Sequence, residues 1–459
     1  MKQFAKKSLV LFIALFFTAA LSAKTPKYIF YCIGDGMSFA HVMATQLFYE
    51  NGNYEDGNES LVFLDFPVRS AIRTYANNSL ITCSAAAGTA LATGHKTNLA
   101  HIGIGPDKQP LTSVAKQLRD KGYAIGIITS GQLDDATPAA FYAGQMRNDT
   151  YQIDFLAGST LMKPFNRRDP SQPYIYDYYR QKGYTVCRGP EGYNSQKNAD
   201  KILLVDTDTT LKKWLPYVIE REPGKLGLEF MVQAGIEKLY KKKNKKGFFM
   251  MIEGASIDHA SHPRDIATTI KETIEFDRSV RLAYEFYKKH PDETLIIVTA
   301  DHETGGLTIG ETTTHPFNWE YVNYQKMSKE SLSKLFQKMR ETGEIDTWEK
   351  TKKILAENTG LWDKIPVNAG EEAQLMQCYY ETIVKKSSKQ EITLYAKSEP
   401  LVADAIALLN KKIGVGWTSF SHTGGFVPFY AIGCQARQFG ALNDNIEIPN
   451  TIRKIMKIK

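Results

Sequence analysis

Cysteine is scarce in this chain of 459 residues, and the five that occur are odd in number and widely spaced. Such a pattern shows no disulfide framework, which argues against a small secreted scaffold held by cross-links. We expect Cys32 to lie in a buried strand. Cys187, Cys378 and Cys434 could pair in an oxidising compartment, and their spacing favours no particular pairing.

Long apolar runs are equally scarce, and the only one, residues 9–21, lies at the N-terminus. Three lysines precede it and small residues follow it, which is typical of a cleavable secretory signal peptide over residues 1–23. We therefore expect a periplasmic or secreted protein without a membrane span. Cleavage would remove three lysines and no acidic residue, lowering the formal net charge from +7 to +4. So mild a charge argues against nucleic acid as a dedicated partner.

Four shorter apolar runs are present, and each leads into residues that can bind metal ions. The runs are residues 28–33, 124–129, 248–252 and 295–299. Short continuous apolar runs are typical of strands buried on both faces, and hence of a parallel sheet. Sites in open α/β sheets form beyond the carboxyl ends of the strands. We therefore predict an α/β fold with one composite site to which all four runs contribute.

The spacing of the candidate ligands adds detail. Asp258 and His262 are four residues apart, so on a helix they share one face and can chelate one ion. Asp301 and His302 are adjacent, so both reach inward only from a turn. His422 stands alone after the run at residues 415–420, and a lone His is more often structural. Its glycine-rich flank and the need for one more imidazole favour a ligand role.

Ser84 begins a run of small, helix-compatible residues, 84–93. The N-terminus of a helix offers unpaired N–H groups and the positive end of the dipole, which suit an anion. The simpler alternative is a serine N-cap on an alanine-rich core helix. The metal-type clusters elsewhere in the chain favour the functional interpretation.

Together these motifs resemble those of the alkaline phosphatase family, from about residue 27 to the C-terminus. The matching motifs lie at residues 34–37, 84–86, 135–140, 253–258, 299–302 and 422–424. The resemblance implies a three-layer α/β/α fold with a large, mostly parallel sheet, occupying residues 24–459. It also implies that Ser84 is a nucleophile that becomes phosphorylated, and that the protein hydrolyses phosphate monoesters.

The resemblance sorts the other site residues into two Zn²⁺ sites and one Mg²⁺ site. One Zn²⁺ would bind Asp258, His262 and His422, and the other would bind Asp35, Asp301 and His302 together with Ser84. The Mg²⁺ would bind Thr137, Glu253 and a bridging Asp35. Asp135 would position waters around the Mg²⁺, and His259 would reach the metals or the phosphate through water. Carboxylate with imidazole suits Zn²⁺, whereas an all-oxygen set suits Mg²⁺.

Three departures from the family pattern bear on function, and one of them is His259, which stands where some members have Lys. Cys83 stands where the family usually has Asp before the nucleophile, and we interpret it as a small buried hydrophobe. The family's phosphate-binding Arg falls on Asn148 by count, so a one-residue deletion would bring Arg147 to the phosphate; the alternative is a solvated Arg147. Without that Arg, a phosphodiesterase or phosphonate hydrolase is the alternative.

Two other functions carry less support. A sulfatase would need Cys-x-Pro-x-Arg, and residues 83–87 lack both Pro and Arg. A catalytically silent metal- or phosphate-binding protein is opposed by the complete ligand set.

The segment at about residues 311–412 interrupts the chain between His302 and His422. It is rich in Lys, Glu and Ser, and has helical patches at 328–340 and 371–386. In the family this region forms a cap or crown beside the active site and sometimes contributes to dimer contacts, so a homodimer is possible. A solvated helical embellishment is the alternative.

Overall fold

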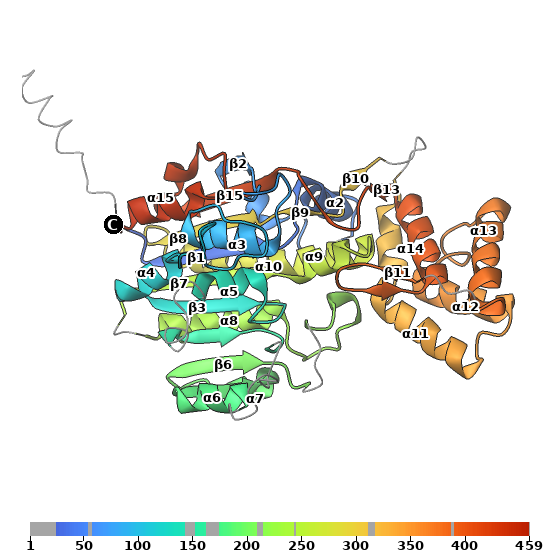
Figure 1. Ribbon diagram of the computed structural model, residues 1–459, viewed down its shortest axis with the longest axis horizontal. Helices are drawn as coiled ribbons and strands as arrows, with labels where there is room; N and C mark the ends of the chain where they lie inside the picture. The colour runs from blue at the N-terminus through green and yellow to red at the C-terminus, as the bar shows by residue number, and fades with distance from the viewer. Residues whose placement is uncertain are drawn as a thin grey trace, which may run out of the picture.

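The computed structural model describes residues 24–53, 57–142, 152–161, 174–208, 214–242, 245–310, 317–386 and 390–458. Its centre is a nine-stranded sheet with the strand order β2-β15-β8-β1-β7-β3-β4-β6-β5 (Figure 1). The bounds are β1 (Tyr28–Gly34), β2 (Val68–Ile72), β3 (Ala124–Thr129), β4 (Phe155–Ala157), β5 (Tyr184–Arg188), β6 (Lys201–Val205), β7 (Phe248–Gly254), β8 (Thr294–Ala300) and β15 (Val427–Gly433). In this sheet only β15 runs antiparallel to its neighbours. The prediction of a large, mostly parallel sheet is confirmed.

The four predicted apolar runs form β1, β3, β7 and β8, which lie side by side in the middle of the sheet. Every residue in these four strands is buried. Helices cover both faces, so apolar side chains are favoured on both, and this explains the continuous apolar runs.

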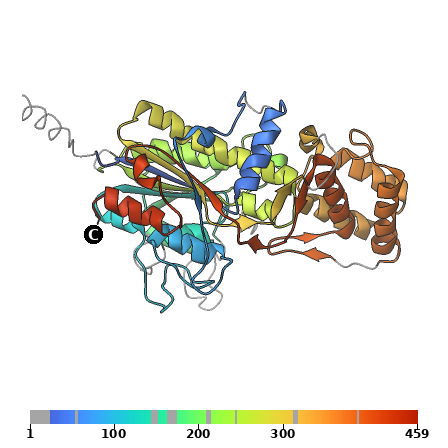
Figure 2. The same ribbon diagram turned by 90° about the horizontal axis from the view of Figure 1, so that it is seen from above.

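The helices form the outer two layers (Figure 2). One face carries α3 (Ser84–Thr93), α4 (Val114–Asp120), α5 (Ala136–Tyr142) and α15 (Glu447–Ile455). The other carries α2 (Phe39–Glu50), α8 (Leu228–Tyr240), α9 (Ser256–Ser261) and α10 (Ile266–Lys289). The short helices α6 (Ile175–Gln181) and α7 (Gly189–Gln196) pack by the edge strand β5, and α7 also contacts its neighbour β6.

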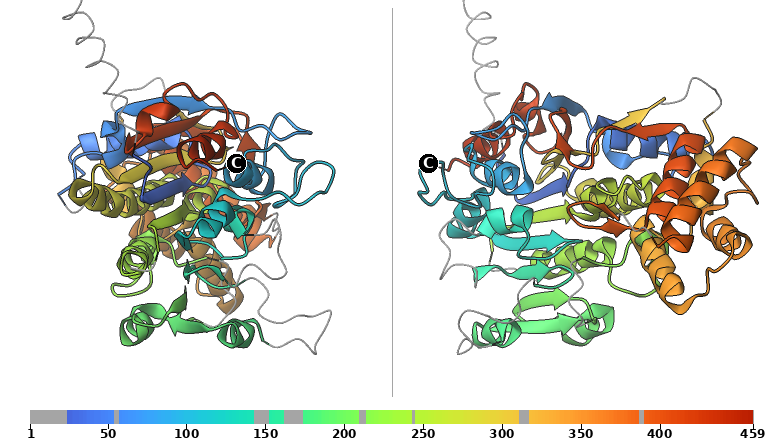
Figure 3. Two further views of the ribbon diagram at one scale, coloured as in Figure 1. Left: turned by 90° about the vertical axis from the view of Figure 1, so that its left-hand side faces the viewer. Right: turned by 45° about the vertical axis from the view of Figure 1, so that its right-hand side comes forward.

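A helical lobe projects beyond α9 at one end of the sheet (Figure 3). It contains α11 (Lys329–Thr342), α12 (Trp348–Thr359), α13 (Ala369–Tyr379) and α14 (Pro400–Ile413). A two-stranded hairpin, β11 (Glu391–Ile392) and β12 (Lys397–Ser398), precedes α14. The lobe has a buried apolar interior, to which Leu332, Phe336 and Leu355 contribute, and it belongs to the same hydrophobic core as the central sheet. It corresponds to the predicted helical insertion, whose residues 311–316 and 387–389 lie outside the described residues.

Four short strands complete the region around the ends of the main strands. They are β9 (Glu303–Thr304), β10 (Leu307–Ile309), β13 (Val415–Trp417) and β14 (His422–Thr423). β14 pairs with β9 and β13 pairs with β10, so the chain returns from the lobe to the end of β8. These pairings bring His422 back to a site that begins at residue 35.

Among the described residues, no helix has both the length and the apolar character needed to cross a membrane. All five cysteines are free thiols, so none of the possible pairings forms. The predicted signal peptide, residues 1–23, lies outside the described residues.

Candidate active site

The carboxyl ends of the four central strands meet at one level of the sheet. Gly34 at the end of β1 is in register with Gly254 of β7 and Ala300 of β8, and Thr129 of β3 is in register with Glu253. The polar residues that follow these strands therefore converge. They are Asp35, Asp135, Thr137, Glu253, Asp258, His262, Asp301 and His302.

One cluster joins Asp258, His262 and His422. His262 Nε2 lies 3.4 Å from Asp258 Oδ2, and His422 Nε2 lies 3.6 Å from Asp258 Oδ1. The two Nε2 atoms are 3.3 Å apart. Asp258 belongs to α9 and His262 caps its C-terminus in helical conformation, so the two residues share one helix face. These three side chains thus offer one carboxylate and two imidazole nitrogens to a common point.

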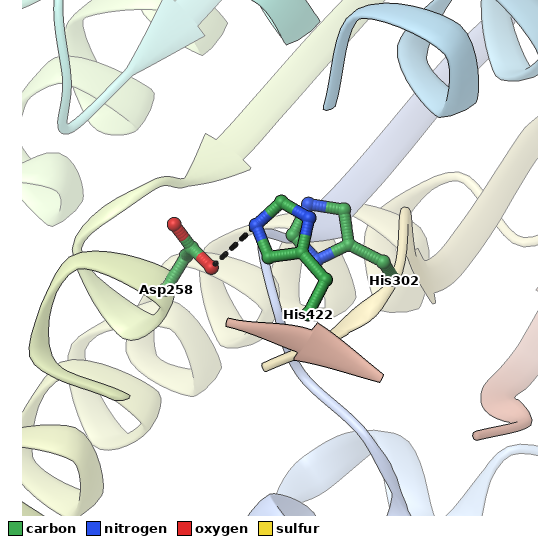
Figure 4. Close-up of side chains that lie close together, drawn as sticks. All are labelled: Asp258, His302 and His422. Carbon is green, nitrogen blue, oxygen red and sulfur yellow. Dashed lines mark ion pairs between the residues drawn. The ribbon is translucent and has the colours of Figure 1, made fainter. Parts of the chain in front are cut away.

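A second cluster joins Asp35, Asp301, His302 and Ser84. His302 Nε2 lies 3.4 Å from Asp35 Oδ1, 3.2 Å from Asp301 Oδ2 and 3.1 Å from Ser84 Oγ. The His302 and His422 rings stack at 3.6 Å between centroids, so the two clusters adjoin (Figure 4). Ser84 is the first residue of α3, and Cys83 is the N-cap, without a side-chain capping bond. The alternative of Ser84 as a capping serine is therefore wrong.

Hydrogen bonds behind the site fix the orientation of all three imidazoles. Nδ1 of His262 lies 2.6 Å from the Phe420 carbonyl oxygen, and Nδ1 of His422 lies 3.2 Å from the Thr82 carbonyl oxygen. A carbonyl only accepts, so each Nδ1 carries the proton and each Nε2 turns a lone pair inward. The Thr304 hydroxyl donates to Asp258 and so accepts from Nδ1 of His302, 3.2 Å away. This is the arrangement that metal-binding histidines require.

Gly36 allows the backbone to pass close to the clusters. Its φ of +72° is strained for other residues, and a Cβ there would lie 2.8 Å from Thr304 Oγ1. Its N–H donates to Asp301 Oδ1 at 3.2 Å, and the His302 N–H donates to the same oxygen at 2.9 Å. Both donors hold one oxygen of Asp301, which leaves the other oxygen directed at His302.

A third group, richer in oxygen, lies beside Asp35. Glu253 accepts a hydrogen bond from the Thr129 hydroxyl. Thr137 is buried in the first turn of α5, and its hydroxyl lies close enough to Glu253 to lower the pKa of that carboxyl. Asp135 precedes that helix and accepts from the Ala136 N–H at 2.8 Å.

Burial makes the carboxylates of the site difficult to ionise unless positive charge lies nearby. Burial and the carboxylates of Asp301 and Asp258 raise the pKa of Asp35 well above its usual range. Burial raises the pKa of Asp301 to about 7 and that of Glu253 to about 8. Burial also opposes ionisation of Asp258, but the His262 imidazole holds its pKa well below the usual range.

The site passes a direct test of fit to metal ions. Asp35 Oδ1, Asp258 Oδ2 and Asp301 Oδ2 are buried and have no hydrogen-bond partner. Leaving a buried anionic oxygen unpaired is costly, and here three of them face inward-turned imidazoles. Two overlapping ligand sets are each compact enough to hold one ion, Asp258 with His302 and His422 and Asp35 with Asp301 and His302. They share His302, and the first has His302 where the predicted set has His262. The donor types suit Zn²⁺.

Aromatic residues enclose His259, a feature that the sequence did not reveal. Its ring lies 4.5 Å from that of Trp214 and 4.4 Å from that of Tyr395, between centroids, and its Nδ1 has no hydrogen-bond partner. Tyr395 lies in the hairpin of the helical lobe, where neither motif nor periodicity marks it. Cys83 is only half-buried and accepts a hydrogen bond from the Ala100 N–H at 3.3 Å, so it is not a simple core hydrophobe. Arg147 lies outside the described residues.

The family model for alkaline phosphatase matches residues 26–164 and 196–458. The chain belongs to the alkaline phosphatase family. Its relatives include alkaline phosphatase 4 of Bacillus subtilis, 30% identical over 93% of this chain and 87% of the relative. A second, alkaline phosphatase 3 of the same bacterium, is 27% identical over 100% of this chain and 98% of the relative.

Solved structures agree with this assignment. A cold-active alkaline phosphatase from a psychrophilic Shewanella species has a TM-score of 0.73 and 25% identity, covering 94% of this chain and 99% of that one. The Thermus thermophilus alkaline phosphatase has the same fold, with a TM-score of 0.76 at 24% identity, over 95% of this chain and 92% of that one. Family and fold together support a phosphatase function for this member of the alkaline phosphatase family.

Proposed function

We propose that this protein hydrolyses phosphate monoesters through a phosphoserine intermediate on Ser84. The observation that carries the proposal is the contact of Ser84 Oγ with His302 Nε2, 3.1 Å, inside a cluster of inward-facing buried carboxylates and imidazoles. A hydroxyl so placed can act as a nucleophile, and the carboxylates and imidazoles around it can bind cations. The matching family and fold support a phosphoryl group as the group transferred.

Three cations fit the residues present. Asp258, His262 and His422 would hold one Zn²⁺, Asp35, Asp301 and His302 the other, and Thr137 and Glu253 with Asp35 a Mg²⁺. When bound, these ions would supply Lewis-acid stabilisation of the negative charge on the attacking and leaving oxygens. Asp135 and His259 would act on them through water.

The chain itself supplies the nucleophile and its alignment. Ser84 Oγ attacks phosphorus, the bond to the ester oxygen breaks, and the alcohol leaves. Water then cleaves phosphoserine, releasing inorganic phosphate and restoring the Ser84 hydroxyl. The first N–H that bonds within α3 is that of Ala87, which leaves the N–H groups of Ser84, Ala85 and Ala86 free of the helix ladder. Such groups at a helix N-terminus stabilise phosphate oxygens.

Other parts of the proposal rest on sequence. Arg147 would clamp the phosphoryl group through two parallel charge-assisted bonds. Secretion after cleavage of residues 1–23 also stays a prediction. The possible homodimer also rests on the family resemblance, which gives the cap region a part in dimer contacts.

Hydrolysis of 4-nitrophenyl phosphate and of bis(4-nitrophenyl) phosphate, before and after chelation, tests the function. We expect the monoester to be strongly preferred, activity to disappear on chelation, and Zn²⁺ with Mg²⁺ to restore it. Metal analysis should give about two Zn²⁺ and one Mg²⁺ per chain, since the ligands form two nitrogen-containing sets and one oxygen set. A preference for the diester would favour the phosphodiesterase alternative, and a single Ca²⁺ or Mg²⁺ would contradict the metal assignment.

His422→Ala should remove one Zn²⁺ selectively. The variant leaves Asp258 and His262 without their third ligand, while Asp35, Asp301 and His302 stay intact. We expect metal analysis after dialysis to fall from about two Zn²⁺ to about one, because a two-ligand site holds Zn²⁺ weakly. His95→Ala, which removes an exposed imidazole, is the matched control. Equal loss of every metal, or of none, would refute the ligand assignment.

A further inference from the structure

The hairpin of the helical lobe reaches back to the candidate active site. β11 and β12 extend from the lobe toward α9 (Figures 1 and 3). Thr393 N–H donates to the Ala396 carbonyl at 2.8 Å and closes the turn that carries Tyr395. The hairpin is anchored at its base by the ion pair of Glu391 with the buried Lys329, 2.6 Å. The position of Tyr395 is therefore set by the lobe rather than by a free loop.

Tyr395 turns inward, whereas Leu394, which precedes it, turns outward. Its ring contacts His259 at 4.4 Å and His262 at 5.1 Å between centroids. Trp214 closes the group, 5.7 Å from Tyr395 and stacked obliquely on His259. In contrast, Leu394 is 64% exposed. The fold therefore holds the half-buried Tyr395 ring against two imidazoles.

Part of the Tyr395 side chain stays accessible. The residue is half-buried, although its ring packs against the imidazoles of His259 and His262. The remaining ring surface can therefore meet a bound ligand.

The contacts also separate Tyr395 from the nucleophile. Ser84 contacts His302, whereas Tyr395 contacts His262, which belongs to the other cluster. In an in-line displacement the leaving oxygen departs opposite the attacking oxygen. The cluster that does not hold the nucleophile is therefore the side on which the alcohol leaves.

We propose that Tyr395, supplied by the helical lobe of the same chain, contacts the alcohol part of the phosphate ester and favours aromatic over small aliphatic alcohols. The inference rests on the proposed function. Tyr395 presents a ring to the leaving group, and Trp214 and His259 hold that ring in place. Rings that meet edge to face or offset gain attraction beyond the area they bury.

Tyr395→Ala separates the two kinds of substrate. We expect kcat/KM for 4-nitrophenyl phosphate to fall about three- to tenfold, the loss of one aromatic contact, and that for glycerol 2-phosphate to stay within about twofold. Inhibition by phenylphosphonate should weaken by the same factor while inhibition by methylphosphonate is unchanged. Tyr395→Phe keeps the ring and should keep the preference. Leu394→Ala, from the same turn but exposed, is the matched control and should alter neither ratio.

The possible outcomes distinguish a failure of this inference from a failure of the proposed function. An equal fall for both substrates, with loss of bound Zn²⁺, would give Tyr395 a purely structural role and overturn the inference. Unchanged ratios in an active Tyr395→Ala variant would overturn it too, and would leave the proposed function standing. A wild-type protein that hydrolyses neither monoester would instead refute the proposed function itself.

Discussion

Ser84→Ala should abolish hydrolysis of monoesters, with kcat/KM lower by roughly three orders of magnitude or more, as for other enzymes that lose a covalent nucleophile. Ser84 Oγ is the hydroxyl that contacts His302 at the N-terminus of α3. Alanine fits the helix well, so the fold should be kept. Metal content should stay near that of the wild type, because Asp35, Asp301 and His302 remain. Steady-state kinetics and metal analysis of the same preparation check both statements.

Cys83→Ala is the matched control for Ser84→Ala. Cys83 is the neighbouring residue, it lies at the N-cap, and its side chain makes no capping bond. We expect activity within about tenfold of the wild type, since only the weak bond from Ala100 is lost. If the two results were reversed, Cys83 would be the nucleophile and the sulfatase alternative would return.

The covalent intermediate can be observed directly. Acid quenching during turnover should trap one phosphoryl group on the peptide that contains Ser84, and none on that peptide in Ser84→Ala. Near-full activity of the alanine variant, or a phosphoryl group on another residue, would refute the double-displacement mechanism.

The centre of the fold could be predicted because strands that are buried on both faces appear in the sequence as continuous apolar runs. β1, β3, β7 and β8 are buried along their whole length, so each contains a continuous apolar run, and the polar residues near its end mark where the run stops. The polar residues beyond those ends followed from the topology of parallel sheets. The helical pairing of Asp258 with His262 followed from their spacing alone.

Other features depend on contacts between distant segments. The carbonyl groups of Phe420 and Thr82 orient His262 and His422. Every residue has a backbone carbonyl, so the sequence does not show which ones do this. Thr304, which joins Asp258 to His302, looks like any strand residue. β11 and β12 have two residues each, too few for a periodic pattern, so the approach of Tyr395 could not be foreseen.

Ser84 shows how close a local interpretation can come and still miss. The run of small residues correctly predicted a helix, and serine is a preferred N-cap. The helix instead begins with Ser84 itself, and Cys83 occupies the cap. Because the cap lies one residue earlier than Ser84, the serine hydroxyl does not cap the helix and contacts His302 instead.

Chelated protein should lose thermal stability as the pH rises from about 5 to 8.5, and metal should abolish most of this loss. Burial raises the pKa of Asp301 to about 7 and that of Glu253 to about 8 in the folded protein, against about 4 when unfolded. Below pH 4 both states hold these protons, so the groups cost nothing. As the pH rises toward 8, the unfolded chain releases its protons while the folded chain retains them or ionises at a cost, so stability falls. Bound cations pair with the carboxylates and remove that cost.

Glu253→Gln distinguishes this mechanism from other buried acids. Glu272 and Asp277 also have pKa values raised by burial, to about 8 and about 7, but neither belongs to the site. Glu272 and Asp277 destabilise the metal-loaded and the chelated protein equally. Their effect therefore cancels in the difference between the melting temperatures of the two samples. That difference should widen with pH in the wild type and widen less in Glu253→Gln, because the neutral amide has no proton to lose. Thermal melts of the four samples at pH 5, 6.5 and 8 measure it. A difference that stays constant with pH would mean that the buried carboxylates are neutralised by something other than bound cations.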